Sequence, residues 1–136
     1  MAGLAAVIIA GHDYRLAAAE HFGLDLVETH VIGYLHANGP MHQGRLAQHL
    51  GVTSGGVTGV VDRLERKGTV RRVADPHDRR HRLLELTDRA RQIVTESDAS
   101  LARSFDALEP DVVATLLDAL PRLAAGMDAE AGRMRR

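Results

Sequence analysis

The stretch "VTSGGVTGVVDRLERKG", residues 52–68, combines an apolar helical period with an unusual amount of glycine. Its apolar residues recur at the i, i+3, i+4, i+7 spacing of a buried helical stripe. They are Val57, Val60, Val61 and Leu64. Each of the glycines Gly55, Gly56 and Gly59 weakens a helix by about 0.5–1 kcal/mol relative to alanine. We therefore predict a short helix in which the absence of side chains on the outer surface serves a function.

A second short helix precedes this one. The segment "MHQGRLAQHLGVT" predicts a helix from about His42 to Leu50 that ends at Gly51. Thr53 is suited to cap the next helix at its N-terminus, and Gly68 is suited to end it. Two compact helices joined by a turn that contains glycine are typical of a helix-turn-helix.

After Gly68 the apolar period changes from helical to alternating. "TVRRVA", residues 69–74, and "HRLLELT", residues 81–87, predict two strands. The connecting segment "DPHDRR" contains the turn formers Asp75, Pro76 and Asp78. The sequence thus predicts a β-hairpin with a basic tip directly after the helix-turn-helix.

Longer helices are predicted on both sides of this segment. The first runs from about Leu4 to Phe22, and the second runs from Asp25 to Ala37. The expected apolar side of the second helix consists of Leu26, Val27, His30, Val31, Tyr34 and Leu35. After the hairpin, Thr87 is expected to cap a helix from Asp88 to about Leu108, and Pro110 to begin a final one. The pattern predicts a mainly α fold with a small β wing.

Composition excludes several classes of protein. With 136 residues, 26% charged and 45% hydrophobic, the chain is typical of one soluble globular domain. It contains no cysteine, which excludes disulfide frameworks, thiolate metal sites and thiol nucleophiles. The apolar run of residues 4–10 has no preceding basic residue and is far shorter than the roughly 20 residues that a membrane span needs. We expect a cytoplasmic protein without a membrane partner.

The charge is unevenly distributed along the chain. The formal net charge is −1, yet the segment from Arg63 to Arg82 holds eight basic residues against three acidic ones. This polarity fits one surface that faces an anion such as nucleic acid. A solvated surface with ordinary ion pairs would give the same count, so both interpretations stay open.

The wing carries the most specific motif. "DPHDRRHRLLELT" contains Asp78-x-Arg80 and, six residues after the arginine, Leu86-Thr87. In this motif and in the order of helix, turn, helix and wing, residues 46–87 resemble the DNA-binding core of the MarR family of bacterial transcription regulators. The resemblance implies N-terminal helices in residues 1–37 that contribute to dimerisation and begin the core. It further implies a winged helix-turn-helix in residues 38–87 and C-terminal dimerisation helices in residues 88–136.

The resemblance also implies a function and a set of DNA contacts. A homodimer would bind a pseudo-palindromic operator in double-stranded DNA, as a repressor. Since an α-helix turns about 100° per residue, Gly55 and Gly59 fall opposite the apolar stripe, where the backbone can approach bases and phosphates. Arg80 is expected to enter the minor groove while Asp78 holds its guanidinium in a bidentate pair. The candidate DNA-binding residues are Ser54, Gly55, Thr58, Gly59, Arg63, Arg66, Asp78, Arg79 and Arg80.

Two positions depart from the family pattern. Gly59 stands where many members carry arginine or another larger residue, which implies thinner direct base readout. Sequence preference would then depend on Ser54, Thr58, Arg63 and DNA shape. His42 stands where relatives usually place a serine or threonine cap, and it is expected either to cap poorly or to reach a phosphate when protonated.

The effector is the least determined part of the function. Members of the family often bind small aromatic or phenolic anions between the dimerisation helices and the winged helix, and His12, Tyr14, His30 and Tyr34 are the candidates for such a site. A metal-responsive regulator is an alternative because the chain has eight histidines, although no metal site or cofactor is indicated. A winged-helix adaptor that binds protein rather than DNA is a further alternative. No nucleophile motif or phosphate loop indicates an enzyme.

Overall fold

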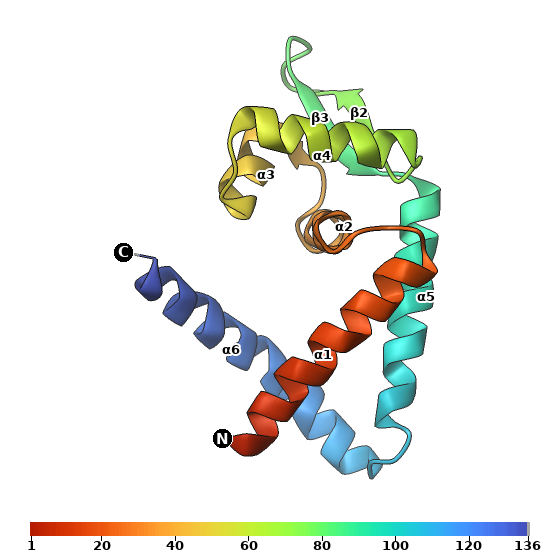
Figure 1. The fold of residues 1–136 in the computed structure, drawn as a ribbon, viewed down its shortest axis with the longest axis vertical. Helices are drawn as coiled ribbons and strands as arrows, with labels where there is room; N and C mark the ends of the chain where they lie inside the picture. Colours follow the sequence, from red (N-terminus) through yellow and green to blue (C-terminus); the bar gives the residue numbers. More distant parts are fainter. Residues whose placement is uncertain (136) are drawn as a thin grey trace. The chain divides into compact units, whose positions relative to one another are not determined.

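The computed structural model describes residues 1–135. Its elements in chain order are α1 (Ala2–His21), α2 (Leu26–Asn38), β1 (Met41–His42), α3 (Gln43–Leu50), α4 (Ser54–Arg66), β2 (Val70–Ala74), β3 (Arg82–Leu86), α5 (Asp88–Ala102), the 3-10 helix η1 (Arg103–Phe105) and α6 (Pro110–Met134). The predicted mainly helical fold with a small β wing is confirmed (Figure 1).

The chain divides into two compact units. The first spans Met1–Ser97 and contains the helix-turn-helix, the sheet and most of α5, while the second begins at Asp98 and contains α6. The predicted functional segments of residues 1–37, 38–87 and 88–136 stay a prediction, and the last residue of the third lies outside the described part of the chain. Between residues 1 and 135, no helix has both the length and the apolar character of a membrane span.

The sheet has three antiparallel strands in the order β1-β3-β2. The hairpin of β2 and β3 pairs Val70 with Leu86 and Ala74 with Arg82, within the two predicted strands. The edge strand β1 pairs Met41 with Leu84 and was not predicted. Two residues are too few to show an alternating period, so this strand forms only because β3 offers it a free edge.

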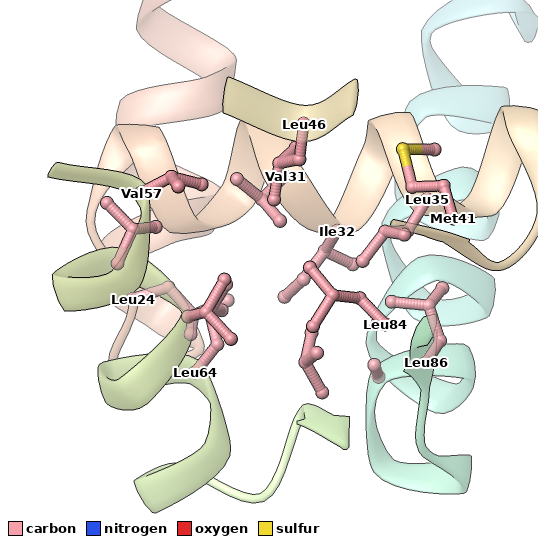
Figure 2. Close-up of a cluster of buried hydrophobic side chains, with 14 of the residues drawn as sticks. Leu24, Val31, Ile32, Leu35, Met41, Leu46, Val57, Leu64, Leu84 and Leu86 are labelled. Atoms are coloured by element: carbon pink, nitrogen blue, oxygen red, sulfur yellow. The ribbon is translucent and has the colours of Figure 1, made fainter. Parts of the chain in front are cut away.

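The core of the first unit lies between α2, α3, α4 and the sheet. The predicted stripe of α4 is confirmed, because all four of its apolar residues are buried. Leu46 of α3 and Leu84 of β3 are also fully buried, and the cluster extends to Ala90 and Ile93 of α5. Figure 2 shows that leucine, valine and isoleucine side chains from these elements fill this region. The core thereby fixes α4 with its opposite face outward.

The predicted apolar side of α2 was partly wrong. Val27 is 44% exposed, whereas Ile32, which was not assigned to that side, is buried together with Val31 and Leu35. Glu28 shares the buried face and has no exposed surface. A carboxylate that is neutralised by cations can occupy a core position, so the apolar pattern alone placed the centre of the buried face too close to Val27 and missed Glu28 and Ile32.

The ends of the helices follow local chemistry. Thr53 caps α4 by accepting a hydrogen bond from the Gly56 amide at 3.2 Å, and Thr87 accepts one from Ala90 at 3.3 Å, as predicted. His42 precedes α3 without a side-chain cap bond. The predicted helix after Thr87 was too long: α5 ends at Ala102 and η1 follows it. The Ser104 hydroxyl there donates to the Leu101 carbonyl at 2.6 Å, a local bond that competes with helix continuation.

Each unit has a helix whose large apolar side chains are exposed. In the first unit, Val7, Ile8, Ile9 and Leu16 of α1 are exposed. In the second unit, none of the residues of α6 is buried. The large exposed apolar residues of α6 are Val112, Leu116, Leu117, Leu120, Leu123, Met127 and Met134.

Candidate nucleic-acid interface

The outer face of α4 is open. Gly55 and Gly59 are exposed, and a Cβ atom added at Gly59 would have no heavy atom within 4 Å apart from the neighbouring residues and the adjacent backbone of the same helix. Packing inside the chain therefore does not require glycine at position 59. Ser54 is also exposed and Thr58 is half-buried, so the first two turns present small groups and backbone to the outside. Such a surface permits a close approach by another molecule.

A side-chain network holds the hydroxyl of Thr58. Its Oγ1 donates to the Ser54 carbonyl at 2.8 Å and accepts a hydrogen bond from Nε2 of Gln43 at 2.7 Å. Gln43 is the first residue of α3, and sequence analysis did not single it out. No local pattern could have indicated this contact, because its two residues are 15 positions apart and meet only through the packing of α3 on α4.

Arg63 lies at the other end of α4 and faces a buried acid. Its guanidinium pairs with Glu28 and with Asp25, each at 3.3 Å. Lys67 pairs with the same Glu28 at 2.6 Å. Arg63 is thus engaged inside the first unit, and its proposed contact with DNA would compete with these pairs. Glu28 was not among the predicted site residues, although an acidic residue between apolar positions of α2 was the available signal.

The tip of the wing holds one arginine in a fixed orientation. Nε and one terminal nitrogen of Arg80 donate to the two carboxylate oxygens of Asp78 at 3.0 and 2.9 Å, which confirms the predicted bidentate pair. The Arg80 side chain is nevertheless 86% exposed. The pair lowers the pKa of Asp78 and raises that of Arg80. Arg79 beside it is exposed and, within residues 1–135, has no ion pair. The loop projects beyond α4 (Figure 1).

The base of the wing is tied to α4 and to β1. Arg72 of β2 pairs with Asp62 of α4 at 2.9 Å and also with Glu65. His42, which was expected to cap α3 poorly or to reach a phosphate, pairs with Asp75 at 3.1 Å. Hydrogen bonds from the backbone, above all from His77, lower the pKa of Asp75. These contacts fix the hairpin relative to the helix-turn-helix.

The positive charge of this region is partly neutralised. Of the eight basic residues from Arg63 to Arg82, five pair with carboxylates of the first unit. Arg66, Arg79 and Arg82 have no such pair in the described chain. Ordinary ion pairs therefore account for five of these cations, and an anion-facing role of the other three stays a prediction.

The four candidate effector residues do not form one group. His30 and Tyr34 of α2 lie together, because both rings stack on His49 of α3, with centroid distances of 4.9 and 3.5 Å. The Nε2 atoms of His30 and His49 are 2.8 Å apart. Tyr14 instead donates its hydroxyl to the Ser97 carbonyl at 2.7 Å, and His12 is exposed on α1. Within residues 1–135, no three histidine or acidic side chains form a metal-binding group.

Known proteins share this architecture. A family model described as MarR family matches residues 22–81. The chain is 34% identical over 107 residues to the uncharacterized HTH-type transcriptional regulator YcgE of Bacillus subtilis strain 168. The aligned region covers 74% of this chain and 70% of the relative. The crystal structure of RV1404 from Mycobacterium tuberculosis is 26% identical and has a TM-score of 0.70, with 93% of this chain and 90% of that chain covered.

A structure of S. aureus MepR in complex with DNA is similar in fold. It has a TM-score of 0.63 at 21% identity, over 93% of this chain and 99% of that one. The regulators in these comparisons, together with the winged helix and its basic tip, place the protein among transcriptional regulators rather than enzymes. This chain belongs to the MarR family, and its winged helix is the DNA-binding part of a transcriptional regulator.

Proposed function

We propose that the protein is a homodimeric repressor that binds a pseudo-palindromic operator, with α4 in the major groove and Arg80 of the wing in the minor groove. The observation that carries this proposal is the wing tip. Arg80 is almost fully exposed, and yet Asp78 holds its guanidinium by two hydrogen bonds. An arginine that is ordered before binding loses less side-chain entropy when it enters a narrow groove of negative potential.

The bare face of α4 supports the major-groove contact. Gly55 and Gly59 lie on it, and the exposed Arg66 follows two turns later. A backbone without side chains can come close to phosphates, and the N-terminus of a helix attracts them. Arg66 and Arg79 have no carboxylate partner among the described residues and are the proposed phosphate contacts. The fold of MepR, which is similar and occurs in a complex with DNA, supports DNA binding by this fold.

The apolar faces of α1 and α6 support self-association. Soluble monomers rarely expose many large apolar side chains on their helices, and a second copy of the chain would cover them. A two-fold axis would set the two α4 helices to read half-sites related by inverted symmetry, about one turn of DNA apart. Light scattering at micromolar concentration is expected to give the mass of two chains. A folded monomer would contradict the dimer.

We further propose that a small aromatic or phenolic ligand releases the protein from its operator. His30 and Tyr34 connect α2 to α3 through His49, so a flat aromatic ligand that displaced one of these rings would change the packing of the helix-turn-helix. Benzoate and phenol are suitable probes. Either compound is expected to lower the fluorescence anisotropy of a labelled operator complex, and less so with Tyr34→Ala. Equal anisotropy at millimolar ligand would contradict the release.

The experiment that tests the proposal as a whole is selection from random duplex DNA at two salt concentrations. We expect an enriched inverted repeat whose affinity falls steeply with salt, and a promoter reporter with that repeat that is silenced by the protein. Arg79→Ala combined with Arg80→Ala should abolish enrichment, whereas Arg122→Ala in α6 should not. Failure to bind any duplex at low salt would refute the proposal.

A further inference from the structure

The hydroxyl of Thr58 has little freedom left. A hydroxyl group offers one donor and two acceptor lone pairs. The donor is used by the Ser54 carbonyl, and one lone pair receives Nε2 of Gln43. What remains for a ligand is a single acceptor and the methyl group of the side chain.

The amide of Gln43 is itself oriented by its neighbours. Its Oε1 accepts a long hydrogen bond, 3.4 Å, from a terminal nitrogen of Arg72. Arg72 in turn is held by Asp62 and Glu65 of α4. Since the cation lies on the oxygen side, the amide presents its NH2 group to Thr58. One network therefore joins α3, α4 and strand β2 of the wing.

We propose that Gln43 determines base specificity by holding Thr58 as a hydrogen-bond acceptor. The inference depends on the proposed function, in which α4 lies in the major groove. There, adenine and cytosine present amino donors and thymine presents a methyl group, whereas the edge of guanine presents only acceptors. An acceptor hydroxyl with a methyl group fits the first three and opposes guanine. Gln43 acts as a positioning residue, because its effect on the base passes through Thr58.

This arrangement gives α4 a way to discriminate bases without a long side chain. Position 59 is glycine, and Arg63 is engaged by Glu28 of α2 and by Asp25, which caps that helix. Of the small groups on the first two turns, Thr58 is the one whose side chain is fixed from a different helix. A fixed acceptor discriminates more sharply than a freely rotating hydroxyl, which can become a donor when the base requires one.

The test measures affinity for a set of duplexes that carry each base pair at every position of the selected site. The proteins are the wild type, Gln43→Ala, Thr58→Val and the double variant. The control is Gln48→Ala on the same helix, since Gln48 is exposed and makes no side-chain hydrogen bond within residues 1–135. Circular dichroism and thermal melting establish that each variant is folded. Thr58→Ser, which keeps the hydroxyl, provides a further background should Thr58→Val not fold.

We expect Gln43→Ala to reduce discrimination against guanine by roughly two- to tenfold at one position of each half-site, the value of one hydrogen bond, and to leave the other positions unchanged. Thr58→Val should change the same position, and adding Gln43→Ala to it should have no further effect there. In Thr58→Ser the effect of Gln43→Ala should persist.

Three results would overturn the inference. The first is that Gln43→Ala has the same base preference as Gln48→Ala. The second is that the effects of Gln43→Ala and Thr58→Val on base preference are additive. The third is that Gln43→Ala lowers affinity equally at all positions of the site, which would make Gln43 a phosphate contact. A wild type that selects a sequence but shows one of these results leaves the proposed function intact. A wild type that binds no duplex refutes the proposed function and the inference together.

Discussion

The substitution Glu28→Gln should destabilise the protein substantially although it changes the shape of the side chain little. Glu28 is fully buried, and its carboxylate receives Lys67, Arg63 and the backbone amide of Asp25. A glutamine keeps one acceptor oxygen, but its NH2 group must face one of these donors. Hydrogen bonds to charged groups contribute about 1.5–3 kcal/mol each.

The partners limit the size of this effect. Arg63 and Lys67 are 40% and 36% exposed, so water can solvate either cation when the carboxylate is removed. We therefore expect the free energy of unfolding to fall by about 1.5–3 kcal/mol, rather than the larger loss of a pair that is buried on both sides. For a chain of this length, that corresponds to a decrease of roughly 5–10 °C in melting temperature.

Urea unfolding followed by circular dichroism measures the change. Glu20→Gln on α1 is the matched control, because Glu20 is exposed and has no ion pair among residues 1–135. Lys67→Met supplies a double-mutant cycle in which the effect of Glu28→Gln should shrink. A difference between Glu28→Gln and Glu20→Gln of less than about 0.5 kcal/mol, the usual range of surface substitutions, would refute the reasoning.

Three further predictions concern the interface and pH. Gly59→Ala should raise the free energy of unfolding by about 0.5–1 kcal/mol, because the added Cβ meets no neighbouring group. The same substitution should weaken operator binding in a titration. Tighter binding would contradict the close approach of the α4 backbone to DNA. Arg80→Ala should weaken binding and lower the salt slope by about one, whereas Arg122→Ala should leave both unchanged. Burial, and then the nearby His49, lower the pKa of His30 in the folded chain. As the pH decreases, His30 is therefore protonated in the unfolded chain before it is protonated in the folded one. The free energy of unfolding should consequently fall as the pH decreases below about 6.5. His30→Phe should flatten that slope in urea titrations, and an unchanged slope would show that other groups cause it.

The elements that sequence predicts well are those with strong local signals. The stripe of α4 repeats over two turns and is bounded by Thr53 and Gly68, so its period, its cap and its end all agree. In the hairpin, one strand with alternating apolar residues lies on each side of a segment that is rich in turn formers. In the wing, the bidentate contact joins residues two positions apart, Asp78 and Arg80, and short-range chemistry was sufficient to predict it.

What sequence did not predict depends on distant partners. Glu28 is buried only because Arg63 and Lys67 meet it from another helix, more than 30 positions later. Gln43 reaches Thr58 across the turn of the motif, and β1 needs the free edge of β3. In each case a residue acquires its role from packing that no window of neighbouring residues contains.

The helix α6 spans 25 residues and yet buries none of them within its own chain. The stability of an isolated helix in water depends mainly on its length and its intrinsic helix propensity, and glycines and an internal proline lower the propensity of α6. If α6 packs against a second copy of the chain, as proposed above, the order of this segment should rise with protein concentration. In a cell, the number of regulator molecules would then decide both how many operators are occupied and how much of the population is fully folded and resistant to proteases.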